Sequence, residues 1–232
     1  MFGVCGPAPW FCCPRISFND PIHPQYETKS RKKQEREMPY GKFESVEQVA
    51  RIFSIKVKDD FVAGSKSIEL PVRLLQDISI KLLDSLSFRN EATICNKVIT
   101  PILNAVAEQN KPLNVWIEEP FNVDPEKGLA GEPDYLIAPA TDYGGMALPP
   151  LCVIEAKKQD WDAGWAQALA EMVAASLQGA DICYSAVTTG KIWQFGKMES
   201  GIFSKDPNQI SATRELQVVF DTLNWVFGTV NR

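Results

Sequence analysis

The chain has 232 residues, 45% of them hydrophobic, and a formal net charge of −5 at neutral pH, which predicts one domain with appendages rather than two full domains. The acidic balance argues against a protein that coats nucleic acid through bulk electrostatics, although local basic patches remain compatible with DNA binding. The sequence has no apolar run of the roughly 18 residues that a membrane span needs and no recognisable signal peptide, so we predict a cytoplasmic protein without a membrane segment.

The first 37 residues combine scattered prolines and aromatic residues with a basic stretch, residues 29–36, and show neither a helical nor a strand period. This composition predicts a disordered tail. The basic stretch could contact nucleic acid phosphates, but a solvated charge cluster is the commoner role of such a run. Met38 directly precedes the first periodic sequence and is a candidate for the true start of the chain. A single folded domain is predicted over residues 38–232.

Three helices are predicted ahead of the first strand. Residues 46–53 have the apolar spacing of a short helix, and a second helix is predicted from Pro71 to Leu86, with the proline in its first turn. We expect Ser87 to cap a third helix and Pro101 to kink it.

A block of strands follows, separated by turns rich in glycine and proline. Its pattern predicts a three-stranded antiparallel meander, a helix, a two-stranded hairpin and a C-terminal helix. These elements are predicted at residues 114–118, 134–138, 151–157, 163–177, 182–188, 192–196 and 212–227. The stretch 139–150, between the second and third strands, is longer than a minimal meander needs. The predicted fold class is α/β with a mixed sheet.

Charged side chains gather at the end of the third predicted strand. Because side chains alternate along a strand, Glu155 and Lys157 project to the same side, and pairing with the preceding strand brings Asp134 close to Glu155. Glu91 lies on the apolar face of the third helix, where a carboxylate needs a partner. Two carboxylates, waters and a substrate phosphate suit Mg²⁺, and a nearby lysine offsets the charge that builds on phosphorane oxygens.

Each of these features also has an ordinary interpretation. A Pro-Asp pair such as that at Asp134 most often forms a turn, and the Glu-x-Lys pattern at Glu155 is usually an exposed ion pair. Gln167 and Glu171, at i and i+4, are ordinarily a solvated helix face, and Glu91 alone is an acid favoured by the helix macrodipole. The convergence of two carboxylates beside a lysine nevertheless suggests a metal-dependent nuclease.

Several neighbouring residues are predicted to stay outside the site. Lys158 faces away from Lys157 and is expected at the surface, whereas Trp161 and Trp165 are expected to pack rather than to stack on bases. Asp142 and Glu132 could mimic a ligand, but a loop acid is the simpler interpretation.

Other chemistries are excluded by the residue types present. None of the six cysteines has the C-x-x-C spacing of a zinc site, and Cys95, Cys152 and Cys183 are expected as small hydrophobic core residues. His23 is the only histidine, which argues against a histidine base or a multi-histidine metal site. Neither a phosphate-binding P-loop nor a nucleophile elbow is present, so no NTPase motor or serine hydrolase is expected.

Helix, three-stranded meander, helix, strand is the order of elements in the PD-(D/E)XK nuclease superfamily, which the chain resembles over residues 87–196. The motif is matched by Glu91, Pro133-Asp134, Glu155-x-Lys157 and Gln167. The segment 188–195, which follows the helix, makes the resemblance closest to the N-terminal nuclease domain of type I restriction enzyme motor subunits. The resemblance implies a restriction-endonuclease-like core, with extra N-terminal helices and a C-terminal helix.

The resemblance also implies roles for the matched residues. Asp134, Glu155 and Glu91 would hold Mg²⁺, for which Mn²⁺ can substitute, Lys157 would activate water and stabilise charge, and Gln167 would complete the site. The implied function is Mg²⁺-dependent hydrolysis of DNA phosphodiester bonds, in restriction, defence or repair. The rival is a noncatalytic nuclease-fold binding or scaffold subunit that acts with a separate motor ATPase. The acidic net charge argues against tight nonspecific DNA binding by one chain, so a homodimer or a partner protein is expected.

Overall fold

The computed structural model of the protein describes residues 1, 3, 39–158 and 160–231. Apart from residues 1 and 3, the predicted tail lies outside the described residues, as does Met38. The described residues from 39 onward belong to one compact unit, Glu37–Arg232. Among the residues that the structure describes, none of the helices combines the length and the apolar character that a membrane crossing demands.

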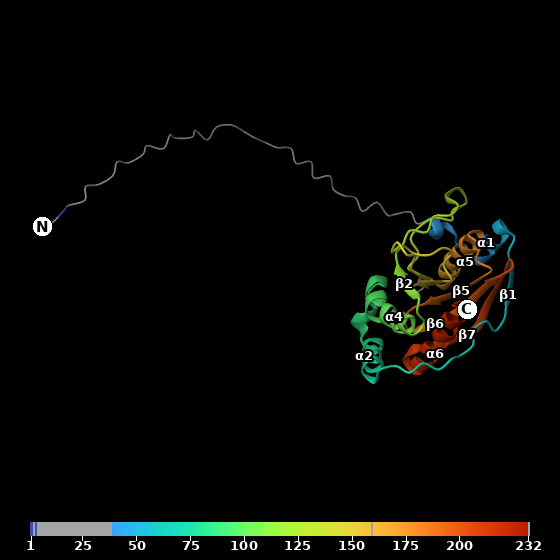
Figure 1. The fold of residues 1–232 in the computed structure, drawn as a ribbon. Helices are drawn as coiled ribbons and strands as arrows, with labels where there is room; N and C mark the ends of the chain where they lie inside the picture. Colours follow the sequence, from blue (N-terminus) through green and yellow to red (C-terminus); the bar gives the residue numbers. More distant parts are fainter. Residues whose placement is uncertain (2, 4–38, 159, 232) are drawn as a thin grey trace, which may run out of the picture. The chain divides into compact units, whose positions relative to one another are not determined.

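A seven-stranded mixed sheet forms the centre of this unit (Figure 1). Its strand order is β1-β7-β6-β5-β4-β3-β2, with β1 parallel to β7, β4 parallel to β5, and the other neighbouring pairs antiparallel. The strands are β1 Lys56–Asp59, β2 Leu113–Ile117, β3 Tyr135–Pro139, β4 Cys152–Ala156, β5 Ile182–Thr188, β6 Ile192–Glu199 and β7 Ile202–Ser211. The predicted meander (β2 to β4), the hairpin (β5 and β6) and the mixed α/β class are confirmed.

Helices cover both faces of the sheet. Helix α5 lies on one face with α1 packed against it, and α4 and α6 cover the other face (Figure 1). The helices are α1 Val46–Phe53, α2 Val72–Leu83, α3 Glu91–Ile94, α4 Thr100–Gln109, α5 Trp161–Leu177 and α6 Ala212–Val230. The arrangement is a three-layer α/β/α sandwich.

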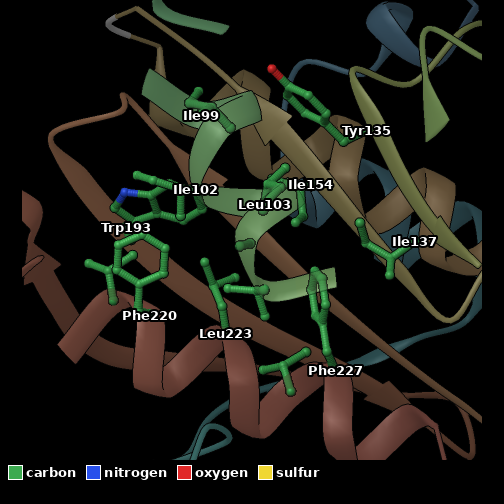
Figure 2. Close-up of a cluster of buried hydrophobic side chains, with 14 of the residues drawn as sticks. Ile99, Ile102, Leu103, Tyr135, Ile137, Ile154, Trp193, Phe220, Leu223 and Phe227 are labelled. Carbon is green, nitrogen blue, oxygen red and sulfur yellow. The ribbon is translucent and has the colours of Figure 1, made fainter. Parts of the chain in front are cut away.

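The face under α4 and α6 holds an apolar layer (Figure 2). Leu103 of α4 and Leu223 and Phe227 of α6 pack in the same cluster as Ile154 of β4, and all four side chains are fully buried. Each large apolar side chain buried in this way contributes about 1.5–3 kcal/mol to the free energy of unfolding. This layer is a main source of the stability of the fold.

The opposite face is closed by α5, which is buried around nearly its whole circumference. Its residues 164–175 are all buried, because α1 and the short 3-10 segment η1 (Pro39–Lys42) pack against it opposite the sheet. Gln167 and Glu171 therefore have exposed fractions of only 7% and 0%. The interpretation of these two residues as a solvated helix face is wrong, because other segments cover that face.

The start of the third predicted helix differs from the sequence prediction. Helix α2 ends at Leu83, and a 3-10 turn, η2 (Ser85–Phe88), follows it. Ser87 lies buried inside that turn, and the cap of the next helix is Asn90, whose Oδ1 accepts a hydrogen bond of 2.8 Å from the backbone N–H of Thr93. Asparagine caps a helix as well as serine does, so the pattern alone did not separate the two candidates.

The two prolines that bear on helix geometry sit at helix starts. Pro71 is the N-cap residue of α2, so the helix begins at Val72, one residue later than predicted. A kink was predicted at Pro101, and directly ahead of it the helical stretch contains a π-helical turn, η3 (Cys95–Ile99), where the N–H of Thr100 bonds to the carbonyl of Cys95. Pro101 is the second residue of α4 and directly follows this π-helical turn.

Two strands were not predicted. Strand β1 is an edge strand with all four residues exposed, so it has no alternation of apolar and polar positions. Strand β7 contains Asp206 and Pro207, and its pairing with β6 is irregular between Gln194 and Gly196. The polar composition of both strands and the bulge opposite β7 remove the alternation of apolar residues on which the strand prediction depends.

Candidate active site

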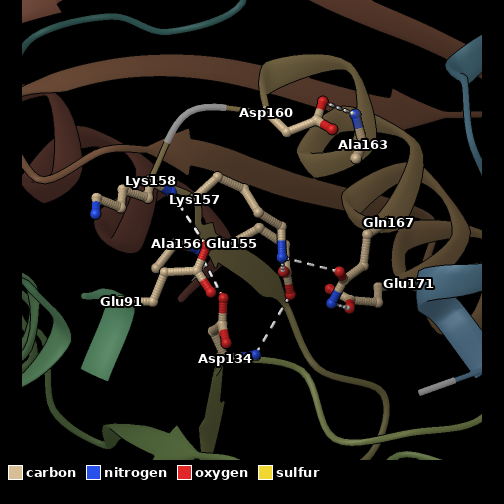
Figure 3. A network of polar contacts seen from close by, with 10 residues as sticks. All are labelled: Glu91, Asp134, Glu155, Ala156, Lys157, Lys158, Asp160, Ala163, Gln167 and Glu171. Carbon is tan, nitrogen blue, oxygen red and sulfur yellow. Dashed lines mark hydrogen bonds and ion pairs between the residues drawn. The ribbon is translucent and has the colours of Figure 1, made fainter. Parts of the chain in front are cut away.

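The candidate site lies where β3 begins and β4 ends, on the sheet face covered by α5. Strands β3 and β4 pair so that Tyr135 lies opposite Ile154. In this antiparallel register Asp134, one residue before β3, comes opposite Glu155. The strand pairing thus brings together the two carboxylates that the sequence predicted to converge (Figure 3).

Two hydrogen bonds fix the carboxylate pair. Oδ2 of Asp134 accepts a bond of 2.8 Å from the backbone N–H of Ala156, and Oε1 of Glu155 accepts one of 3.3 Å from the N–H of Asp134. Each carboxylate is therefore oriented by the backbone of the partner's strand. Glu155 is fully buried, whereas Asp134 is partly buried.

Lys157 leaves the end of β4 and turns its ammonium group back toward Glu155. Its Nζ lies 3.3 Å from Oε2 of Glu155 and donates a hydrogen bond of 3.1 Å to Oε1 of Gln167. The aliphatic stem passes close to α5 at Gly164, where an added Cβ would lie 2.9 Å from Cγ of Lys157 and 2.9 Å from Cγ1 of Val187. Gly164 therefore provides the space that the lysine occupies.

Gln167 and Glu171 extend the network along α5. Nε2 of Gln167 donates a hydrogen bond of 3.2 Å to Oε1 of Glu171, so the amide bridges the lysine on one side and the buried acid on the other. Glu171 was not among the predicted site residues. Its spacing of four from Gln167 was the available signal, but that spacing is equally common on exposed helix faces.

Burial and crowding of the acids dominate the electrostatics of the site. Burial, followed by the charge of Glu171, raises the pKa of Glu155 well above its ordinary value, and burial followed by the charge of Glu155 does the same to the pKa of Asp134. Burial raises the pKa of Glu171 to about 8. Burial alone would lower the pKa of Lys157, but Glu155 and Asp134 outweigh it and raise that pKa. The cluster therefore favours bound positive charge.

Glu91 stands at the rim of the cluster. It is exposed, in contrast to the inward position that its helix stripe suggested, and its Oε1 accepts a hydrogen bond of 3.1 Å from the backbone N–H of Lys158. Lys158 is exposed as predicted, and its side chain points away from that of Lys157 (Figure 3).

The remaining candidate residues lie outside the network. Trp165 is buried and donates a hydrogen bond of 2.9 Å from Nε1 to Oε1 of Gln194, so it packs in the core as predicted. Asp142 is exposed in the loop that follows β3. The predicted burial of Cys152 and Cys183 is confirmed, and Cys95 is half-buried.

The donor set fits a hard divalent cation. Among the described residues, the buried side-chain oxygens without a hydrogen-bond partner are Oε2 of Glu155, Oε2 of Glu171 and Oγ of Ser185, and the two carboxylate oxygens belong to this cluster. Within the same part of the chain, no three His, Cys, Asp or Glu side chains form a preassembled metal cage. Mg²⁺ does not need one, because it is commonly held by one or two carboxylates together with waters and substrate phosphate.

Comparisons with known proteins identify no family. No protein-family model matches the chain, and no curated protein matches it. Among solved structures, the chain is similar to one in a cryo-EM structure of a DrdV–DNA complex, with 12% sequence identity and a TM-score of 0.41. The match covers 68% of this chain but only 14% of the length of that chain. At this level the likeness assigns neither a family nor a function.

Proposed function

We propose that the protein is a metal-dependent nuclease of the PD-(D/E)XK type that hydrolyses DNA phosphodiester bonds. The observation that carries the proposal is the fully buried carboxylate of Glu155 beside Asp134, because its Oε2 has no hydrogen bond and only an ion pair of 3.3 Å with the ammonium group of Lys157. Two adjacent buried carboxylates are costly to ionise with a single lysine beside them, so a bound cation would offset that cost.

In this proposal Asp134 and Glu155 hold Mg²⁺, and Glu91 contributes a further carboxylate ligand from the exposed edge of the cluster. When bound, the ion polarises a phosphoryl oxygen and lowers the pKa of a bound water. The protein's own contribution is orientation, because the backbone hydrogen bonds to Asp134 and Glu155 hold both carboxylates toward one point before substrate arrives.

Lys157 supplies the positive charge of the site. Its ammonium group is held between Glu155 and Gln167, so it enters the reaction in a defined position, where it can orient water and stabilise charge on the phosphoryl oxygens. Gln167 fixes the lysine, and Glu171 fixes Gln167. The order of elements from α3 through α4, β2, β3, β4, α5 and β5 supports the proposal of a restriction-endonuclease-like core.

Nicking of supercoiled plasmid tests the proposal. We expect wild-type protein to nick in Mg²⁺ or Mn²⁺ and not in EDTA, and we expect Glu155→Gln to lose nicking. The matched control is Glu126→Gln, which neutralises an exposed acid of the 3-10 turn Pro125–Lys127 and should cleave as wild type does. RNA and single-stranded DNA are run in parallel.

Nicking that survives Glu155→Gln would refute the assignment of the site. An absence of metal-dependent cleavage on every substrate, with and without a motor ATPase partner, would favour the noncatalytic scaffold instead.

A further inference from the structure

Three basic residues, Arg89, Lys158 and Lys191, lie on neighbouring segments next to the candidate site and are called the basic rim below. Arg89 directly follows η2, Lys158 follows Lys157 at the end of β4, and Lys191 lies in the turn between β5 and β6. Nζ of Lys158 donates a hydrogen bond of 3.1 Å to the carbonyl of Arg89. Nζ of Lys191 lies 4.2 Å from the ring centroid of Phe88, the neighbour of Arg89.

Close backbone packing holds the β5–β6 turn against the start of α3. Gly190 has a φ of +77°, and a Cβ added there would lie 2.8 Å from Cγ2 of Ile94 and 3.4 Å from Cε1 of Phe88. The turn that carries Lys191 is therefore fixed next to the segment that carries Arg89. The basic rim is a built feature rather than a chance approach of long side chains.

The positive charge of the basic rim is not neutralised within the described part of the chain. None of its three cations forms an ion pair with a described carboxylate, whereas Lys58 and Lys197 elsewhere on the sheet pair with Asp60 at 2.6 Å and Glu199 at 2.9 Å. These cations without an ion pair occur in a chain whose net charge is −5.

Two acids border the basic rim, and both accept hydrogen bonds from backbone N–H groups. Glu91 accepts a hydrogen bond from the N–H of Lys158, and Asp160 caps α5 by accepting one of 3.0 Å from the N–H of Ala163. The ammonium group of Lys158 instead contacts a neutral carbonyl and is exposed. The cations thus remain available to an external anion.

We propose that the basic rim binds backbone phosphates of the nucleic acid strand that is presented to the carboxylate site. The identification of the bound strand as substrate rests on the proposed nuclease function. Lys157 and Lys158 are adjacent in sequence, but their side chains point in different directions (Figure 3). Lys157 would therefore contact the phosphate at the carboxylates, and Lys158 would contact a neighbouring phosphate outside them. The rim fixes the position of the strand and is not a catalytic element.

Salt dependence of binding tests this surface directly. Lysines that neutralise phosphates release counterions, so each contact contributes about 0.9 to the slope of log affinity against log salt for duplex DNA. Binding of a labelled short duplex is measured by fluorescence anisotropy, with Ca²⁺ in place of Mg²⁺ to limit cleavage. We expect the double variant Lys158→Gln/Lys191→Gln to lower the slope by about 1.8 and to weaken binding severalfold regardless of sequence.

The matched control is Lys58→Gln/Lys197→Gln, which removes the same formal charge. In the strand register Lys197 lies opposite Tyr184, whose side chain belongs to the apolar cluster under α6. Glu155 lies opposite Val187, whose side chain belongs to the cluster under α5. The control lysine Lys197 is therefore on the other sheet face from the carboxylate site. We expect this control to leave the slope unchanged, and Lys158→Arg/Lys191→Arg to restore wild-type binding. Thermal unfolding of each variant checks that the fold is retained.

Equal slopes for the two Gln double variants, or an unchanged slope in the Lys158→Gln/Lys191→Gln variant, would overturn the proposal that the basic rim binds phosphates. Wild-type binding that does not depend on salt would overturn it as well. Failure of the nuclease proposal has a different signature. DNA would then bind with a slope that depends on the rim, but no metal would produce cleavage.

Discussion

The sheet face under α4 and α6 and the face under α5 are both closed to solvent, yet they are filled differently. Leu103, Leu223 and Phe227 pack on apolar strand residues on the first face. The second face is apolar over most of its area but buries Glu155 and Glu171 where β4 ends. Buried acids stabilise a fold less than apolar side chains of similar size do. The contrast separates a face filled by apolar side chains from one that gives up stability to bury an acidic cluster.

The largest expected change in stability comes from the apolar face. Phe220→Ala should lower the free energy of unfolding by about 3–5 kcal/mol, because Phe220 is fully buried and truncation leaves a cavity. Urea denaturation measures the loss. Val218→Ala, on the same helix at 41% exposure, is the control and should change it by less than about 0.5 kcal/mol. A loss below about 1 kcal/mol for Phe220→Ala would show that this layer is not the main stabilising core.

On the α5 face, the largest expected change is in activity rather than stability. Lys157→Met keeps the aliphatic stem and removes the ammonium group, so we expect cleavage to fall by roughly 10²–10³-fold, the usual effect of deleting one charge-stabilising donor. Stability should fall less than in Phe220→Ala, because Glu155, whose pKa is raised by burial, can take up a proton when its ion-pair partner is removed. The control is Lys127→Met, which removes an exposed lysine paired with Asp124 at 2.9 Å and should cleave normally. Comparable losses of cleavage in both variants would contradict the role of Lys157.

Glu171→Gln should stabilise the metal-free protein. Because burial raises the pKa of Glu171 from 4.5 to about 8, the folded state binds the proton more tightly than the unfolded state does. The contribution of this group to stability is therefore fully present below pH 4.5 and is lost as pH rises toward 8. Glutamine removes that loss, so at pH 8 in EDTA the variant should be more stable than wild type by about 1–3 kcal/mol.

The comparison of Glu171→Gln with wild type is made by denaturation across pH. The difference should shrink as pH falls and vanish below pH 4.5, where the wild-type acid is protonated in both states. A variant that is less stable than wild type at pH 8 would mean that the charged form of Glu171 stabilises the folded state.

The smallest expected effect is that of Gly164→Ala. The added methyl group would lie 2.9 Å from Cγ of Lys157, so the lysine must move, and we expect cleavage to fall by roughly 10-fold to 100-fold. Helix propensity favours alanine by about 1 kcal/mol, so the fold should persist. Gly145→Ala, whose added Cβ would meet Thr141 at 3.7 Å, is the control. Unchanged cleavage by Gly164→Ala would show that the lysine position is not critical.

Much of the fold could be predicted from the sequence because local patterns reported it. Apolar runs between turns predicted the β2–β4 meander and the β5–β6 hairpin, and alternation along the strands predicted the approach of Asp134, Glu155 and Lys157. The edge strand β1 and the bulged strand β7 were not predicted, because neither has the apolar period of a buried strand.

The burial of Gln167 and Glu171 could not be predicted for a different reason. Local sequence shows which residues share a helix face, but not which distant segment covers it. Here α1 and η1 close α5 from outside, and these segments lie far earlier in the chain. The same limit applies to the basic rim, whose three cations come from separate parts of the sequence.

Calorimetric titration of Mg²⁺ or Mn²⁺ tests most directly whether the α5 face was shaped to bind a metal. Wild-type protein and Asp142→Asn, which alters an exposed loop acid, should bind the ion with the same affinity. Asp134→Asn should weaken binding at least about tenfold, because it removes one of two proposed carboxylate ligands. Equal binding by all three proteins, or no binding by wild type with or without DNA, would contradict the metal site.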